Sequence, residues 1–356
     1  MKISVYAIAK NEEKFVKRWV CSMNEADEII VLDTGSTDST VKLLSSYDKV
    51  QVFQENIKPW RFDTARNLSL SLVCDDTDYC VCTDLDEVFS KGWRKALEKS
   101  LISRPDKVSY RYIWSFKPDG SEDTVFNIEK IHKRHGFMWT HPVHEVLTPT
   151  NGISPVTVFA DGVLLSHHPD KDKSRAQYLP LLELSVKEKP QDDRNVHYLG
   201  REYMFYGKYD EAISTLKKHL ALKTARWADE RCASMRYISR CLAAKGDKKN
   251  ALLWLLKACA EAPHLREPWM ETAKHLYNEK NWQGVIFFIN KALEVTDKKD
   301  TYISDASLWK ELPYDLLSIA YFYTGNKADA IKNAEIALRY SPDNERIKTN
   351  LRLYKS

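Results

Sequence analysis

The chain lacks any apolar run long enough to cross a bilayer, although it has 356 residues. Its opening, MKISVYAIAKNEEKF, is interrupted at Lys10–Glu13, which is too early for the apolar region of a signal peptide. Its seven cysteines form no CxxC pair and no zinc-finger spacing. We therefore expect a cytoplasmic protein without a membrane span, whose reduced thiols mostly pack in the core, and we do not expect zinc.

Two signatures of nucleotide binding are also missing, because the sequence has neither a GKS or GKT phosphate loop nor a GxGxxG fingerprint. The formal net charge of +4 is small for this length. It fits an anionic substrate, but it does not by itself indicate a nucleic-acid partner. With 43% hydrophobic and 29% charged residues, the composition is that of a globular protein, and the length suits two domains.

The first half of the chain alternates strand-like with helix-like segments. The predicted strands are Ile3–Ala9, Glu28–Leu32, Val50–Gln54 and Tyr79–Thr83. The predicted helices are Glu13–Asn24, Ser39–Ser46 and Phe62–Leu72. This alternation predicts an α/β domain with a mostly parallel sheet that is covered on both faces. Between Val108 and Leu165 the pattern becomes irregular and rich in β signals, as expected for an extension of the sheet with loops that carry functional residues.

Carboxylates follow two of these strands. The stretch CVCTDLDEVF ends the fourth strand with Asp84 and Asp86, which strand alternation would point to the same side. Like charges so close repel unless a cation or hydrogen-bond donors lie between them, and oxygen ligands favour a hard divalent metal. Asp33 ends the second strand within VLDTGSTDST. At that place a carboxylate can accept hydrogen bonds from a base N–H or a ribose hydroxyl.

The second half has a helical repeat with a period of roughly 34 residues, as in tetratricopeptide units. Small residues such as Gly200 and Ala212 would let neighbouring helices approach, and one Gly-led turn would separate the helices of a unit. The four predicted units lie near Asp193–Arg226, Cys232–Leu265, Arg266–Lys299 and Glu311–Asn344. The sequence thus predicts an α/β domain over residues 1–186 and an all-α tetratricopeptide domain over residues 187–356.

Four segments in order, VYAIAKNEEKFV, EIIVLDTGSTDST, WRFDTARNLSL and CTDLDEVF, resemble the nucleotide-sugar domain of the large inverting glycosyltransferase family of GT-A fold, glycosyltransferase family 2. The resemblance covers roughly residues 1–89 and implies a Rossmann-like domain. It also implies roles for individual residues. Asp33 would hold the uracil or ribose, Asp84 the ribose or the water shell of the metal, and Asp86 a Mn²⁺ or Mg²⁺ ion. Arg66 would help to hold the nucleotide, and Ala9 and Glu12 would flank its base and ribose.

Members of this fold often have a histidine as a further metal ligand, downstream of the paired acids. The run LLSHHPD offers His167 and His168, of which we favour His168. Inverting transfer also needs a base that takes the acceptor proton from the face opposite the diphosphate. In the segment WTHPVHEV, Glu145 is the first candidate for this base and His144 the second. Glu145 could instead form an ion pair with Lys133 or Arg134.

These features predict a metal-dependent inverting glycosyltransferase that takes its sugar from a nucleotide diphosphate, UDP in the first place. The acceptor would be a peptide or protein side chain, a lipid-linked glycan or a modified DNA base. The helical array would dock that acceptor, join two protomers into a homodimer, or both. One alternative is a non-catalytic interaction scaffold with a degenerate sugar-nucleotide domain. Another is a nucleotidyltransferase, which the lack of a Gly-rich basic phosphate loop disfavours.

Overall fold

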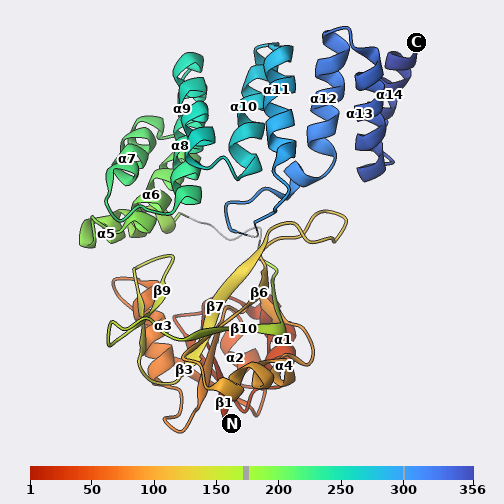
Figure 1. Ribbon diagram of the computed structural model, residues 1–356. Helices are drawn as coiled ribbons and strands as arrows, with labels where there is room; N and C mark the ends of the chain where they lie inside the picture. Colours follow the sequence, from red (N-terminus) through yellow and green to blue (C-terminus); the bar gives the residue numbers. More distant parts are fainter. Residues whose placement is uncertain (171–175, 300) are drawn as a thin grey trace. The chain divides into compact units, whose positions relative to one another are not determined.

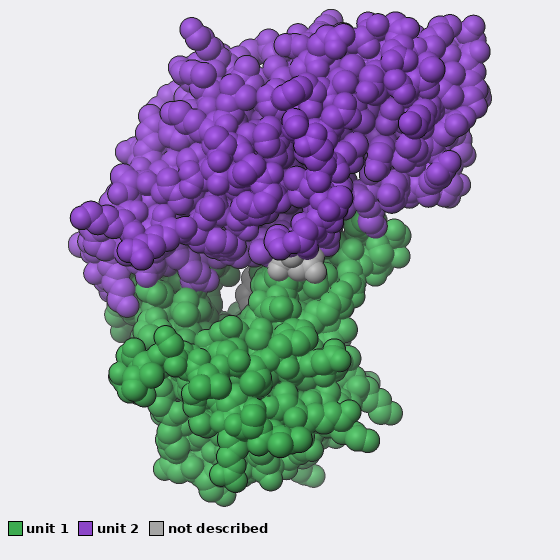
Figure 2. Space-filling view, in the orientation of Figure 1, with its two compact units in different colours: residues 1–185 green, residues 186–356 purple. Residues whose placement is uncertain are grey.

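The computed structural model describes residues 1–170, 176–299 and 301–356, and these form two compact units. Met1–Ser185 make up the N-terminal unit and Val186–Ser356 the C-terminal unit, drawn in green and purple in Figure 2. The N-terminal unit has the α/β composition that the sequence predicts, and the C-terminal unit is helical (Figure 1).

The N-terminal unit is built on an eight-stranded sheet with the strand order β3-β2-β1-β4-β7-β6-β10-β5. Its strands are β1 (Ile3–Ala9), β2 (Glu28–Asp33), β3 (Val50–Gln54), β4 (Tyr79–Thr83), β5 (Glu87–Phe89), β6 (Lys107–Ile113), β7 (Val125–Lys133) and β10 (Thr157–His167). Strands β1 to β4 are parallel, which confirms the Rossmann-like prediction. Strand β7 is antiparallel to both β4 and β6, so the sheet as a whole is mixed.

Helices cover both faces of this sheet, because alternate strand residues point to opposite sides. Apolar residues of α1 (Glu13–Met23), α2 (Thr40–Leu44) and α4 (Trp93–Ser100) pack with Val5 and Val31 on one face. Tyr6 and Ile30 face the other side, where they pack with Leu70 of α3 (Phe62–Ser71). A separate hairpin, β8 (Phe137–Thr140) and β9 (Val146–Pro149), lies beside α3 on that face (Figure 1).

A buried chain of hydrogen bonds ties this hairpin to the sheet. The indole N–H of Trp139 donates to the hydroxyl of Tyr6 at 2.8 Å, and that hydroxyl bonds Nε2 of His132 at 2.8 Å. Nδ1 of His132 donates to the carbonyl of Lys133 at 2.7 Å, so Nε2 is the acceptor. Burial lowers the pKa of His132 to about 4, which keeps the ring neutral. The hairpin, and with it the loop 141–145, therefore has a fixed position on the domain.

The C-terminal unit consists of helical pairs. Its helices after α5 (Tyr178–Glu188) are α6 (Asp193–Phe205), α7 (Tyr209–Ala221), α8 (Ala228–Ala244), α9 (Lys248–Glu261), α10 (Arg266–Asn278), α11 (Trp282–Glu294), α12 (Glu311–Tyr323), α13 (Lys327–Tyr340) and α14 (Glu345–Lys355). Short 3₁₀ turns occur at Leu101–Ser103 in the first unit and Ala306–Trp309 in the second. Each predicted repeat corresponds to one pair, from α6–α7 to α12–α13, although α8 begins earlier than the predicted Cys232.

The turn inside each pair has the same construction. Gly207, Gly246 and Gly325 adopt left-handed φ angles of 71°, 84° and 80°, and Lys280 takes this position in the third pair with a φ of 57°. In all four turns the next residue donates its backbone N–H to the carbonyl five positions earlier, at 2.9 Å. This bond closes the end of the first helix. The repeated turn explains why a Gly-led spacing was visible in the sequence.

No helix among the described residues combines the length and apolar composition that a bilayer crossing requires. The seven cysteines are free thiols, and five of them are buried, as expected for core packing.

Gly200 of α6 lies close against its partner helix α7. A Cβ placed there would lie 2.6 Å from Cγ and Cδ2 of Leu216 and 3.3 Å from its backbone nitrogen. Leu216 is fully buried on α7, so it has little room to move. We therefore predict that Gly200→Ala lowers the free energy of unfolding by about 1–3 kcal/mol, as overpacked core substitutions do. Urea denaturation measures this change.

The control is Gly200→Ala in a Leu216→Ala background, where the obstructing side chain is absent. There the added methyl group should cost clearly less than in the native background. An equal cost in both backgrounds would show that this close contact does not constrain the pair.

Candidate functional site

The predicted donor-binding residues lie at the carboxyl ends of the parallel strands. Ala9 and Asp33 are register partners at the ends of β1 and β2, and Asp84 follows directly after β4. The carbonyl of Ala9 accepts hydrogen bonds from the backbone N–H and the hydroxyl of Thr34, at 2.8 and 3.1 Å. Ligands of open α/β sheets bind at this edge.

Asp33 has one oxygen fixed and one oxygen without a partner. Its Oδ1 accepts the backbone N–H groups of Gly35 and Ser36 at 3.1 and 3.0 Å. Gly35 has a φ of 105°, a backbone conformation that side chains disfavour. Oδ2 is buried and has no hydrogen-bond partner among the described residues. Such an orphaned carboxylate oxygen fits a ligand that supplies an N–H or O–H donor.

The loops after β1 and β2 are bonded to each other. Asn11, at a φ of 55°, donates its N–H to the hydroxyl of Ser36 at 2.8 Å and accepts the N–H of Thr37 at 2.7 Å. The N–H of Glu12 bonds the hydroxyl of Thr40 at 2.7 Å. Asn11 and Glu12 thus fix the loop that follows Asp33, and Glu12 lies at the start of α1.

Asp84 is held by two cations. NH2 of Arg66 donates to its Oδ1 at 2.8 Å, and Nζ of Lys130 donates to its Oδ2 at 3.1 Å. Lys130 also bonds Oε1 of Glu87 at 2.9 Å, while Oε2 of Glu87 accepts the backbone N–H of Asp84 at 2.9 Å. Oε1 of Glu87 further accepts the hydroxyl of Tyr112 at 2.7 Å. We call Arg66, Asp84, Glu87 and Lys130 the charge cluster. Arg66 and Glu87 are buried in it, and the side chains of Lys130 and Asp84 are 16% and 35% exposed.

Charge pairing sets the ionisation of this cluster. Burial alone would raise the pKa of Asp84, but the charges of Arg66 and Lys130 hold it well below its usual range. Burial opposes the charge of Lys130, whereas Asp84 and Glu87 raise its pKa above the ordinary value. Burial raises the pKa of Glu87 despite the nearby ammonium group. Asp84 and Lys130 therefore stay charged, and Glu87 is the group that takes up a proton first on acidification.

Asp84 and Asp86 contact different partners, although strand alternation predicted that both point to the same side. Strand β4 ends at Thr83, and Asp84–Asp86 enter a turn closed by the bond from the N–H of Glu87 to the carbonyl of Asp84 at 3.0 Å. Strand alternation does not apply inside a turn. Asp86 instead faces His167, whose Nε2 lies 3.3 Å from its Oδ2.

His167, not the favoured His168, is the imidazole beside Asp86. Nδ1 of His167 donates to the carbonyl of Trp114 at 3.1 Å, and its ring stacks on Trp114 with centroids 4.4 Å apart. His168 turns away, because adjacent residues at the end of a strand point to opposite sides. Its Nε2 bonds the hydroxyl of Ser166 at 3.0 Å, and its ring stacks on Phe116.

The two candidates for the base lie apart. Glu145 forms an ion pair with Nε of Arg66 rather than with Lys133 or Arg134, and its side chain is 10% exposed. His144 has a φ of 51° and packs its ring against Tyr178, with centroids 5.7 Å apart. The loop that carries them also bonds α3, where the N–H of Phe62 donates to the carbonyl of Pro142 at 3.0 Å.

Arg66 also differs from its predicted role. Its Nε bonds Glu145, its NH1 the thiol of Cys82 at 3.3 Å and its NH2 Asp84, so each of its nitrogens contacts the protein. Burial lowers the pKa of Arg66, but Asp84, Cys82 and Glu145 raise it well above the ordinary value. Arg66 is 5% exposed, and its guanidinium holds both Asp84 and Glu145.

Lys130 and Glu87 are the site residues that sequence reasoning missed. Glu87 lies in the acidic segment CTDLDEVF, but the sequence alone did not indicate a role for it. Lys130 lies on β7, whose pairing of Ile131 with Val81 puts it beside the end of β4. No motif marks this position, since antiparallel register is not readable from one sequence.

Comparison with known proteins agrees with this architecture. Residues 4–153 match the family model described as "Glycosyl transferase family 2". Residues 267–356 match the model described as "Prolyl 4-hydroxylase peptide-substrate-binding domain", a tetratricopeptide family.

Curated relatives include the SPbeta prophage-derived glycosyltransferase SunS of Bacillus subtilis, which is 28% identical over 60% of this chain. The lipopolysaccharide core biosynthesis glycosyltransferase LpsC of Rhizobium meliloti is 26% identical over 43% of it. The chain spans 52% of SunS and 59% of LpsC, little more than half the length of these relatives. Among solved structures, a MamA protein is 17% identical over 47% of this chain and 83% of its own, with a TM-score of 0.37.

Removal of the ammonium group of Lys130 should leave the buried Glu87 and the partly exposed Asp84 without their shared cation. We predict that Lys130→Met lowers the free energy of unfolding at pH 7 by about 3–5 kcal/mol, as for other broken buried pairs. The raised pKa of Glu87 means that its charged form destabilises the fold as pH rises through that pKa. The loss of stability in Lys130→Met should therefore become smaller as the pH is lowered through the raised pKa of Glu87, where this carboxylate binds a proton. Urea denaturation at several pH values measures both effects.

Lys133→Met is the matched control on the same strand. Lys133 pairs with Asp106 at the surface, where the two side chains are 42% and 34% exposed. Its loss should cost less than about 1 kcal/mol. Equal costs for the two variants would contradict the role of the charge cluster.

Proposed function

Because residues 4–153 form a glycosyltransferase family 2 domain, we propose that the protein transfers a sugar from a nucleotide diphosphate to an acceptor with inversion at the anomeric carbon. The donor is a UDP-sugar. The proposal depends on one observation. Oδ2 of Asp33 has no hydrogen-bond partner among the described residues, and Asp86 faces His167. These residues lie at or just after the ends of strands of the same sheet.

Asp33 binds the nucleoside. Its Oδ1 is already occupied by the turn, so Oδ2 is left to accept the N3–H of uracil or a ribose hydroxyl. Ala9 and Glu12 flank this position from the end of β1 and the start of α1. Asp84 stays ionised between its two cations and faces the ribose side, with 35% of its side chain exposed.

Asp86 and His167 fit a divalent metal. The bond from Nδ1 of His167 to the carbonyl of Trp114 fixes the ring and directs Nε2 toward the carboxylate. Such an outer hydrogen bond is typical of metal-binding histidines. One imidazole with one carboxylate suits Mn²⁺ better than Mg²⁺. When bound, the ion neutralises the negative charge of the departing diphosphate.

Glu145 takes the proton from the acceptor. Arg66 holds its Oε1, and Oε2 is the oxygen that accepts the proton. The same guanidinium binds Asp84, so Arg66 links the base to the nucleotide side of the site. His144 does not share this position, because its ring packs against Tyr178.

The acceptor is a peptide or protein, and the helical unit docks it. The match of residues 267–356 to a peptide-substrate-binding family supports this choice over a glycolipid or a DNA base. The hollow found on this unit has mixed charge, with a volume of about 310 Å³ and with Arg240, Glu271, Lys274 and His275 in its lining. Mixed charge favours a polypeptide over the uniform negative charge of nucleic acid.

Asp86→Ala should abolish sugar transfer and leave the fold intact. Release of UDP from a panel of UDP-sugars with Mn²⁺, and with water as the acceptor, gives the readout. We expect a loss on the order of 10²–10³-fold, since charge on the leaving group is no longer stabilised. Asp48→Ala is the control, because Asp48 is exposed and precedes β3 at the opposite end of the strands.

Full activity of Asp86→Ala would remove the metal assignment. If the native protein binds UDP but releases none from any sugar donor, the scaffold alternative is favoured instead. Pyrophosphate release from nucleoside triphosphates would indicate a nucleotidyltransferase.

The two histidines can be told apart by metal dependence. We predict that His167→Ala raises the Mn²⁺ concentration for half-maximal UDP release by about 10–100-fold, the size of effect seen when a metal site loses a supporting group. His168→Ala, the matched control on the neighbouring residue, should change it by less than about threefold. The reverse order would restore the original choice of His168.

A further inference from the structure

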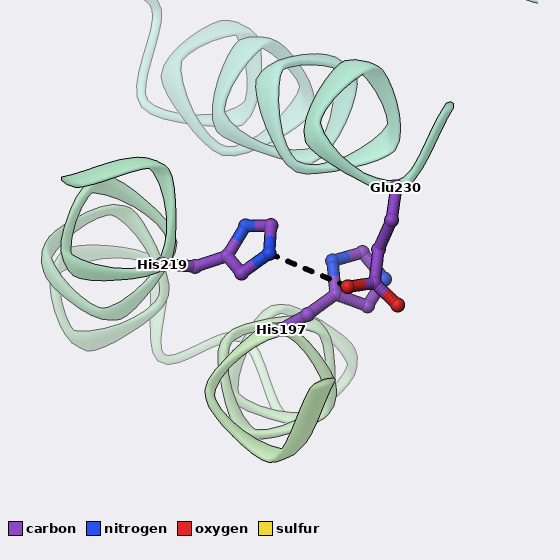
Figure 3. A group of neighbouring side chains, drawn as sticks. All are labelled: His197, His219 and Glu230. Carbon is purple, nitrogen blue, oxygen red and sulfur yellow. Dashed lines mark ion pairs between the residues drawn. The ribbon is translucent and has the colours of Figure 1, made fainter. Parts of the chain in front are cut away.

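The first helices of the C-terminal unit bring together polar side chains that the proposed transfer does not use. His197 of α6, His219 of α7 and Glu230 of α8 point toward one another between the helices (Figure 3). Both histidines are fully buried, and Glu230 is 4% exposed. Each residue offers a ligand atom, and these atoms lie within 4.8 Å of one another.

The orientation of both rings is set by one hydroxyl group. Oγ of Ser234 lies 2.7 Å from Nδ1 of His197 and 2.9 Å from Nδ1 of His219. Nε2 of each ring is buried without a hydrogen-bond partner among the described residues. Nε2 of His219 faces Oε1 of Glu230 at 3.4 Å, which is beyond ordinary hydrogen-bond distance.

Glu230 accepts a hydrogen bond from the hydroxyl of Tyr302. A buried carboxylate beside two imidazole rings whose Nε2 atoms have no hydrogen-bond partner among the described residues is a donor set for a cation.

We propose that His197, His219 and Glu230 form a binding site for one divalent transition-metal ion, Zn²⁺ in the first place. Nitrogen and carboxylate ligands at about 2.0–2.2 Å are those that Zn²⁺ takes. In a tetrahedral site they lie about 3.4 Å apart, so the ligand atoms, now within 4.8 Å of one another, would move closer by at most about 1.4 Å. Ser234 and Tyr302 are the outer partners, since they bond the imidazoles and the carboxylate.

Such an ion would join α6 and α7 of the first repeat to α8 of the second. The sequence did not indicate this site, because the expectation about zinc rested on the spacing of cysteines and none of the three residues is a cysteine. It is independent of the donor site in the N-terminal unit, because its ligands all belong to the C-terminal unit.

Cobalt provides the test, because Co²⁺ replaces Zn²⁺ and absorbs visible light when it is four- or five-coordinate. The full-length Asp86→Ala protein, freed of metal by a chelator, removes the contribution of the donor site. We expect it to bind about one equivalent of Co²⁺, to show d–d absorption that Zn²⁺ abolishes, and to melt at a higher temperature with metal. Absence of binding, or a thiolate-to-cobalt charge-transfer band, would overturn the proposal.

Variants in the same background locate the ion. His219→Gln and Glu230→Gln should each lose the absorption, and Ser234→Ala should weaken Co²⁺ binding by about 10–100-fold. His275→Gln is the matched control on α10 and should bind as the parent protein does. Circular dichroism verifies that each variant is folded. Co²⁺ absorption that persists in folded His219→Gln or Glu230→Gln would also overturn the assignment. If the parent protein itself binds no Co²⁺, the assignment is wrong whatever the variants show.

Discussion

The N-terminal domain depends on how it neutralises the acids that follow β4. Asp84 follows β4 and Glu87 begins β5, and Nζ of Lys130 lies 3.1 Å from a carboxylate oxygen of Asp84 and 2.9 Å from one of Glu87. Arg66 bonds the other oxygen of Asp84. Acidic residues so close together would repel each other without these cations. The protein therefore supplies its own counter-ions for Asp84, whereas Asp86 pairs with His167, the residues of the proposed metal site.

This division of charge organises the rest of the site. Arg66 reaches from α3 to Asp84 and to Glu145, so one buried guanidinium connects the strand edge with the loop of the β8–β9 hairpin. The hairpin itself is fixed by Trp139, whose indole bonds Tyr6 in the central strand β1. Asp33 is preset in the same way, because two backbone N–H groups occupy one of its oxygens. The polar groups proposed to contact the donor are thus held before it binds, as electrostatic preorganisation requires.

Sequence reasoning predicted the elements whose signal is local. Short segments rich in apolar and β-branched residues predicted β1, β3 and β4 with their observed bounds, and the repeated Gly-led turns predicted the helical pairs. It failed where packing between segments far apart in the sequence determines which side chains meet. The antiparallel entry of β7 beside β4 brings in Lys130, and nothing near that residue signals it. The choice between His167 and His168 depends on which face of β10 meets Asp86. His197, His219 and Glu230 come together only because three helices pack, although they are far apart in the chain.

The central claim is that Asp33 and Asp86 bind the two ends of one nucleotide diphosphate. A crystal structure of the protein with UDP and Mn²⁺ tests it most directly. The account predicts uracil or ribose within about 2.6–3.2 Å of Oδ2 of Asp33, with the ion on Asp86 and Nε2 of His167. A nucleotide bound elsewhere, with Oδ2 of Asp33 still unpartnered and Asp86 still paired with His167 alone, would contradict it.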